Sequence, residues 1–278
     1  MKITVAVDNT VPTNAKRPFR GEHGLSLLLE ASDGLFLFDA GQSDLLIHNL
    51  SLLGIRPADL TAIIVSHGHY DHTGGLTAVL THAKKKLPVY IHRDAFIPRF
   101  SQSADQQRFI GIPYSKDLLA QLGADFQYID KPFRLTSDLW LSGPIPRQCS
   151  FETSNQQFVL QDEQNCLCQD HVQDDMAIYH TSAKGLTVIS GCAHAGIINT
   201  IEHGLSVTQE KKLRGIVGGT HLGPATNEQQ MGTLEQLQRY NPECIAPNHC
   251  TGFNVMHTLA HQFPDSFVPA FVGVTIDL

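Results

Sequence analysis

The most informative stretch of this chain is Val65-Ser66-His67-Gly68-His69-Tyr70-Asp71-His72-Thr73-Gly74-Gly75-Leu76. It places three histidines and an aspartate within six residues, directly after an apolar run. Core packing gives no reason to crowd so much imidazole and carboxylate at the end of a buried segment. Neutral imidazole nitrogen and carboxylate oxygen are common ligands of zinc and similar ions. The stretch therefore predicts a metal site.

The spacing of these residues supports the same interpretation. Residues 61–66 are short, apolar and β-branched, which predicts a buried strand. Gly68 permits a sharp turn as the chain leaves that strand, so His67 and His69 can point to the same side of a loop. A helix is expected over 76–82. One stretch thus offers several ligands at the junction of a strand and a helix, and this suits two adjacent ions better than one.

The pattern His-x-His-x-Asp-His after a strand resembles the metallo-β-lactamase superfamily, and residues 66–76 are close to the form found in one branch. That branch comprises the dihydropterin–ribofuranosylaminobenzene-phosphate synthase-like proteins. The resemblance implies an α/β fold, an αββα sandwich, in a single domain over 1–278. Residues 93–175 are expected to form a lid, a substrate-recognition segment or a passive insertion.

The same resemblance implies a set of metal ligands drawn from distant parts of the chain. The first ion would be held by His67, His69 and His194. The second ion would be held by Asp71, His72 and His249. The site is expected to take one or two divalent ions, with zinc favoured.

One position departs from the superfamily pattern. Many members place a bridging aspartate before the last motif, but here the chain has Gly218-Gly219-Thr220-His221. His221 could ligate the second ion, support a ligand or contact substrate, and these alternatives stay open. Asp39, at a strand end, is expected to orient a ligand or the motif loop. Glu22 and His23 are expected near the site, as supporting or substrate-binding groups.

Four separate strand ends carry histidines, and loops at one edge of a layered sheet are where such sites are built. They are the strands that precede His67, His194, His221 and His249. Further helices are predicted over 197–203 and 228–240, and strand material over 268–276. The segment 93–130 is less regular, with a helix predicted over 115–122.

Composition limits the classes of partner. The chain has 278 residues and a net charge of −7, and this excess of acid argues against a nucleic-acid surface. Six cysteines are too sparse for a disulfide scaffold, and Cys166 and Cys168 are expected to be ordinary thiols rather than metal ligands. No apolar run approaches about 18 residues and no signal peptide is evident, so a cytoplasmic protein outside the membrane is expected. A homo-oligomer is compatible with the sequence.

A divalent ion lowers the pKa of bound water to about 7. The predicted site therefore suits a hydrolase that uses a metal-bound hydroxide on a small-molecule ester, lactone or phosphoester. Asp71 is expected to orient the hydroxide and carry its proton, and His221 or His23 to stabilise a developing oxyanion. The branch implies a transferase instead, joining a pterinylmethyl diphosphate to an aryl ribose phosphate. A non-catalytic metal or ligand sensor is the third hypothesis.

Overall fold

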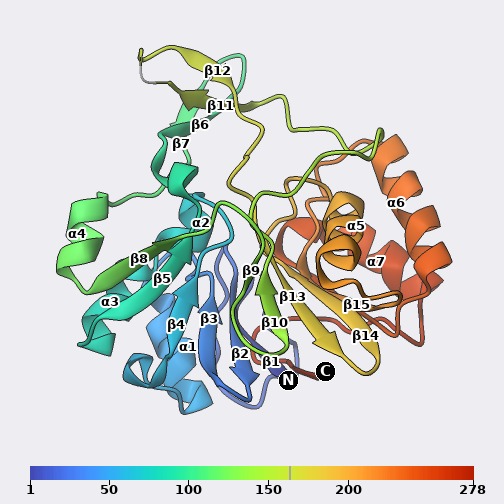
Figure 1. The fold of residues 1–278 in the computed structure, drawn as a ribbon, viewed down its shortest axis with the longest axis horizontal. Coiled ribbons are helices and arrows are strands. Elements are labelled where there is room, and N and C mark those ends of the chain that lie inside the picture. The colour runs from blue at the N-terminus through green and yellow to red at the C-terminus, as the bar shows by residue number, and fades with distance from the viewer. Residues whose placement is uncertain (163) are drawn as a thin grey trace. The chain divides into compact units, whose positions relative to one another are not determined.

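The computed structural model describes residues 1–162 and 164–278, which divide into two compact units (Figure 1). Unit 1 comprises Met1–Tyr128, Gln156–Asp170 and Phe271–Leu278. Unit 2 comprises Ile129–Asn155 and His171–Ala270. No helix among the described residues has the length and apolar character needed to cross a membrane.

Unit 1 is built on a seven-stranded sheet with the order β17-β1-β2-β3-β4-β5-β8. Its strands are β1 (Lys2–Val7), β2 (Ser26–Ala31), β3 (Gly34–Phe38), β4 (Ala62–Ile64), β5 (Leu87–Ile91), β8 (Ala124–Tyr128) and β17 (Thr275–Asp277). β17, β1, β2 and β3 pair antiparallel, whereas β3, β4, β5 and β8 pair parallel. The ends of β3 and β4 therefore lie side by side, and β4 leads directly into the histidine-rich stretch.

The helices of unit 1 cover this sheet with their apolar faces. They are α1 (Leu45–Leu53), α2 (Tyr70–Thr73), α3 (Leu76–Ala83) and α4 (Lys116–Gln121), with 3₁₀ turns at Pro57–Asp59 and Arg93–Phe96. Leu37 and Ile63 of the sheet share one buried cluster with Leu46 of α1 and Leu80 of α3. α1 ends at Gly54, whose φ of 78° is left-handed, as the glycine predicts.

A second, four-stranded sheet of unit 1 has the order β12-β11-β6-β7. Its strands are β6 (Arg99–Gln102), β7 (Gln107–Phe109), β11 (Phe158–Gln161) and β12 (Leu167–Gln169). Of these, the sequence predicted only a strand over 158–160, because the others are short and largely polar. The buried Arg99 guanidinium joins the Asp170 carboxylate at 2.8 Å, which ties β6 to the chain beyond β12.

Unit 2 contains a six-stranded sheet with the order β16-β15-β14-β13-β10-β9. The strands are β9 (Phe133–Arg134), β10 (Leu139–Leu141), β13 (Ala177–Ser182), β14 (Gly185–Ser190), β15 (Leu213–Gly219) and β16 (Cys244–Asn248). The helices are α5 (Ile197–Thr208), α6 (Asn227–Tyr240) and α7 (Phe253–Gln262), with a 3₁₀ turn at His249–Thr251. Because β14, β15 and β16 are parallel, their carboxyl ends share one edge of the sheet.

The elements differ from the sequence prediction in a few places. α5 continues to Thr208, five residues beyond the expected end at His203. α7 was not predicted, and Val255 and Leu259 are its buried residues. Strand material near the C-terminus is confined to Thr275–Asp277. Segment 93–175 supplies strands to all three sheets, and its role as a lid stays a prediction.

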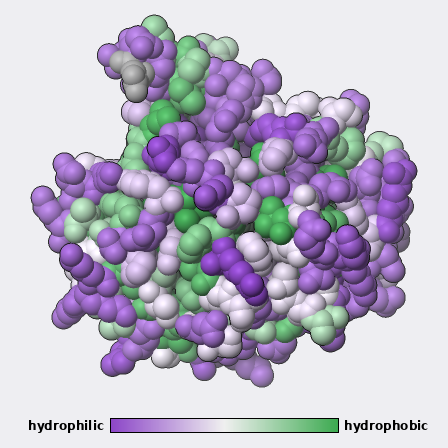
Figure 2. All heavy atoms as spheres, in the orientation of Figure 1, coloured by the Kyte–Doolittle hydropathy of each residue, from purple (hydrophilic) through white to green (hydrophobic). Residues whose placement is uncertain are grey.

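Hydrophilic side chains cover most of the face shown in Figure 2, and hydrophobic ones form separate smaller patches.

The buried carboxyl group of Glu152 caps a helix of unit 2. The Glu152 side chain accepts hydrogen bonds from the backbone amides of Ile198 and Asn199, each at 2.8 Å. It thereby caps α5, whose own N-cap, Gly196, has no side chain. Burial raises the pKa of Glu152 to about 7, and the two amides oppose this shift only in part.

The sign of the resulting pH dependence follows from linkage. The pKa of Glu152 is 4.5 in the unfolded chain and about 7 in the folded one. The folded state is therefore favoured most below pH 4.5, where the carboxyl is protonated in both states, and this stabilisation is lost as pH rises through about 7. Wild-type protein should lose about 3 kcal/mol of unfolding free energy from this group between pH 4.5 and pH 8. Glu152→Gln should abolish this pH-dependent loss of stability. Glu235→Gln, at an exposed position of α6, should leave it unchanged. Urea unfolding between pH 5 and pH 8 measures the difference, and parallel curves for wild type and Glu152→Gln would show the assignment to be wrong.

Candidate metal centre

The histidine-rich stretch is buried at the end of β4. His67 and His72 are fully buried, and His69 and Asp71 are nearly so. Gly68 lies against the backbone of the 3₁₀ turn after β5, where an added Cβ would come within 2.0 Å of the Ala95 carbonyl oxygen. The glycine therefore lets the loop pack tightly, and the histidines on either side of it are held in place.

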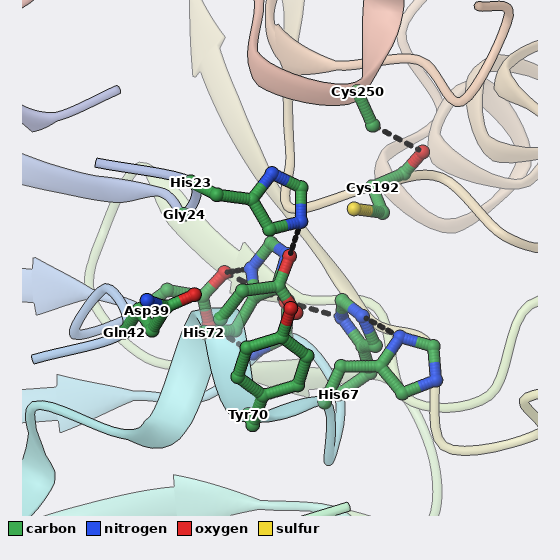
Figure 3. A network of polar contacts seen from close by, with 12 residues as sticks. His23, Gly24, Asp39, Gln42, His67, Tyr70, His72, Cys192 and Cys250 are labelled. Carbon is green, nitrogen blue, oxygen red and sulfur yellow. Dashed lines mark hydrogen bonds and ion pairs between the residues drawn. The ribbon is translucent and has the colours of Figure 1, made fainter. Parts of the chain in front are cut away.

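Asp39 organises the ligands of unit 1. It follows β3 and has a left-handed φ of 60°. Its Oδ1 accepts a hydrogen bond from the Ser66 amide at 2.7 Å, and its Oδ2 accepts one from the Ser66 hydroxyl at 2.7 Å. His72 Nδ1 also donates to Oδ2, at 2.7 Å (Figure 3). One buried carboxylate thus ties the ends of β3 and β4 to α2.

These hydrogen bonds assign the imidazole tautomers. The Ser66 hydroxyl donates its proton to Asp39, so it accepts from His67 Nδ1 at 2.8 Å. The lone pair of His67 is then on Nε2. By the same logic the lone pair of His72 is on Nε2, because its Nδ1 carries the proton given to Asp39. Burial, and then the neighbouring His72 and His69, hold the pKa of His67 well below its usual value, which keeps it a neutral ligand.

The remaining nitrogens converge. His67 Nε2 accepts a hydrogen bond from His69 Nδ1 at 2.9 Å, and a metal ion bound between these two nitrogens would replace that proton. Two ligand atoms on one tetrahedral zinc ion lie about 3.3 Å apart, since each bond is about 2.0–2.1 Å long. Asp71 Oδ2 lies 3.7 Å from His72 Nε2, which forms a second pair of donors. The donor set of unit 1 therefore fits divalent metal ions without large rearrangement.

His23 and Glu22 lie beside this cluster in different ways. His23 Nε2 contacts Asp71 Oδ2 at 3.2 Å. Glu22 accepts hydrogen bonds from the backbone amides of Gln42 and Ser43, at 2.9 and 3.0 Å, and so ties the loop before β2 to the chain that enters α1. Of the two residues, it is His23 that the structure places in contact with a candidate ligand.

In unit 2 the candidate ligands follow the parallel strands β14, β15 and β16. Three residues that are not glycine have left-handed backbones there: Ala193 (φ 56°), His221 (φ 49°) and His249 (φ 49°). This conformation is costly for such residues and is concentrated at functional sites. Asp175 supports the first of these loops, because its Oδ2 accepts the Ala195 amide at 2.8 Å.

The structure brings together His194, His221 and a cysteine that the sequence did not single out as a ligand. The rings of His194 and His221 have centroids 4.3 Å apart. Cys192 Sγ lies within 4.8 Å of a ring nitrogen of His194, and likewise of one of His249. The position of Cys192, two residues before His194, could have marked it as a ligand. A cysteine in such a position is more often a small buried residue that fills space in the core.

Gly218 and Gly219 show why no bridging carboxylate stands before His221. A Cβ on Gly218 would lie 2.0 Å from the Ser190 carbonyl oxygen, and one on Gly219 would lie 2.3 Å from that of Gly191. The end of β15 therefore packs directly on the backbone that follows β14. The first residue with a polar side chain long enough to reach outward is His221, whose amide donates to Cys250 Sγ at 3.2 Å.

Two further sequence features lie apart from these clusters. Cys166 and Cys168 are exposed, at the β12 hairpin of unit 1. Among the described residues, neither belongs to a group of His, Cys, Asp or Glu close enough to hold a metal ion.

Comparisons with known proteins give the family and the fold. A family model described as the metallo-beta-lactamase superfamily matches residues 20–143. The uncharacterized protein MJ0448 of Methanocaldococcus jannaschii is 31% identical over 99% of this chain and 100% of its own length. The 7,8-dihydropterin-6-methyl-4-(beta-D-ribofuranosyl)-aminobenzene-5'-phosphate synthase of the same organism is 29% identical, over 93% of this chain and 91% of its own.

Among solved structures, Tm1679, described as a metal-dependent hydrolase of the beta-lactamase superfamily, matches with a TM-score of 0.85. The match covers 100% of this chain and 99% of that one, at 24% identity. The chain belongs to the metallo-β-lactamase superfamily, as its motifs predicted, and the α/β fold class is confirmed.

Asp39 offers a direct test of the ligand-orienting network. Asp39→Asn keeps the size of the side chain and tolerates the left-handed backbone, but it removes the charge and one of the acceptor oxygens. Loss of such a supporting group typically weakens metal binding about 10- to 100-fold. Competition with a chelator should show that loss, and Asp33→Asn, at an exposed turn, should bind metal as wild type does. Equal affinities in the two variants would contradict the role given to Asp39.

Proposed function

We propose that the chain is a metal-dependent hydrolase acting on a small-molecule ester, lactone or phosphoester. The observation that carries the proposal is the Asp39–Ser66 network, which puts the lone pair of both His67 and His72 on Nε2, so that each can ligate a metal ion as a neutral imidazole. Structural packing alone does not require two buried imidazoles oriented in this way beside a third. Membership of the superfamily supports the same conclusion.

The metal assignment follows the superfamily pattern. His67, His69 and His194 are proposed to hold one divalent ion, and Asp71, His72 and His249 a second. Zinc is the proposed ion, because it accepts nitrogen, oxygen and sulfur donors together. Cys192 is proposed as an additional donor, since its sulfur lies near nitrogens of both His194 and His249. His221, beside His194, is proposed to bind either a metal ion or the substrate.

The protein's own groups then share the work of hydrolysis. A bound divalent ion supplies Lewis acidity, which polarises the scissile group and lowers the pKa of a water molecule to about 7. Asp71 is proposed to orient that water and accept its proton, and the contact with His23 provides a route for the proton towards solvent. His221 is proposed to stabilise the negative charge that develops on the substrate.

A transferase is the second candidate, and a specific observation favours it. The synthase of M. jannaschii is similar over nearly the whole of both chains. A metal centre that stabilises a diphosphate leaving group would use the same ligands. In that case the acceptor would be a second organic substrate rather than water, and the expected products differ.

Turnover of generic substrates tests the proposal. Metal-loaded protein should hydrolyse at least one of a panel of nitrophenyl esters, lactones and phosphodiesters. His69→Ala should lower kcat/KM by at least about 100-fold, because it removes a ligand. His82→Ala should leave the rate unchanged, since this histidine is exposed on α3 and bonds only the Ala78 carbonyl oxygen of its own helix.

The two alternatives predict different outcomes of the same assay. A transferase would release diphosphate only when a pterinylmethyl diphosphate and an aryl acceptor are both present. A sensor would bind metal with no turnover on any of these substrates. Either outcome, with metal binding intact, would overturn the hydrolase proposal.

A further inference from the structure

The small sheet of unit 1 carries a row of three side chains on one face. In the register of this sheet, Arg108 of β7 is paired with Ser101 of β6, and Ser101 with Phe158 of β11. Directly paired residues project from the same face of a sheet. Arg108, Ser101 and Phe158 therefore lie in line across three strands, with the smallest side chain in the middle.

One end of this row reaches a proposed metal ligand. The Phe158 ring packs edge-on against the His69 ring, with centroids 5.2 Å apart and an interplanar angle of 74°. Phe158 is only half-buried, although it lies beside a nearly buried histidine. A hydrophobic ring is thus held at the edge of the candidate centre with part of its surface open.

The other end of the row reaches the same motif. The Arg108 guanidinium donates a hydrogen bond to the Tyr70 hydroxyl at 2.9 Å and lies over the Tyr70 ring, 5.4 Å from its centroid. Tyr70 stands between His69 and Asp71 in the chain. Its phenol is neutral, so these contacts orient the guanidinium without cancelling its charge. Arg108 is exposed and can meet an anion in the bidentate manner that guanidinium favours.

The two ends of the row are separated by the small side chain of Ser101. Adjacent strands are about 4.8 Å apart, so the backbones of Arg108 and Phe158 are about 10 Å apart across Ser101. The buried Arg99–Asp170 ion pair lies on the same face, because Arg99 is two residues from Ser101 in β6, and it holds this strand against the chain beyond β12.

We propose that the Arg108–Ser101–Phe158 row binds a planar aromatic ring bearing an anionic group, a phosphate or a carboxylate. Ring contact is provided by Phe158, and the anion is met by Arg108, which Tyr70 orients. This proposal rests on the proposed function in one respect, because it assigns the row as the surface that recognises the substrate of that metal centre. These residues act in binding and positioning.

Calorimetric titration of the full-length, metal-loaded protein tests the proposal with ligands that cannot be hydrolysed. Phenylphosphonate should bind at least about fivefold more tightly than cyclohexylphosphonate, since ring contacts contribute beyond buried area. Phe158→Leu should reduce that ratio to about one, and Phe158→Tyr should keep it. Phe109→Leu is the matched control, because Phe109 pairs with Phe100 on the opposite face of the sheet and the ratio should not change.

Arg108→Gln tests the anionic end. It should lower the affinity for both phosphonates about tenfold and leave the ratio of the two affinities unchanged. Arg56→Gln, at an exposed ion pair with Asp59, should change neither the affinities nor their ratio. Benzoate and cyclohexanecarboxylate form a second pair, and the anion that shows the larger Arg108 effect is the group recognised. A ratio near one in wild type, a ratio that survives Phe158→Leu, or an unchanged affinity in Arg108→Gln would overturn the proposal.

These results are separable from those of the proposed function. The titrations report binding alone, so a protein that turns over no substrate can still show the aromatic preference. Conversely, a hydrolase that depends on His69 but shows no preference for the aromatic ligand would retain its function and lose this assignment.

Discussion

The structure of the candidate centre depends on the three hydrogen bonds that the Asp39 carboxylate accepts from Ser66 and His72. A buried carboxylate is costly unless its oxygens are satisfied, and here backbone, hydroxyl and imidazole donors satisfy them. Because the donors come from β4 and α2, one side chain fixes two elements and two tautomers. Asp39 takes a left-handed backbone to do so, and aspartate is among the few residues that tolerate it.

The rest of unit 1 maintains that arrangement. The parallel pairing of β3 with β4 places Asp39 beside Ser66, and the close approach of Gly68 to Ala95 holds the loop between the histidines. Unit 2 has similar features. Glycines at the end of β15 pack directly on backbone, and His221 and His249 have left-handed backbone conformations. In both units, strand ends and tight backbone contacts position imidazoles, and the helices supply the core behind them.

The sequence predicted most of the main strands and helices because their apolar patterns are strong, as in residues 61–66 before the motif. It also placed Asp39 at a strand end, and it singled out His23, which contacts Asp71. It missed the strands β6, β7, β9 and β12, whose short segments carry no periodicity, and it missed α7. It could not find Glu152 or the Arg108–Ser101–Phe158 row, since both depend on contacts between residues far apart in the chain.

Asp39 and Ser66 set the tautomers of His67 and His72, and so determine which of their imidazole nitrogens can bind a metal ion. Anomalous diffraction at the zinc edge, on crystals of the zinc-loaded protein, tests it most directly. Zinc should lie about 2.0–2.1 Å from Nε2 of His67 and Nδ1 of His69, with Asp39 still bonded to Ser66 and His72. Zinc bound through Nδ1 of His67 or of His72, or by the Asp39 carboxylate itself, would contradict it.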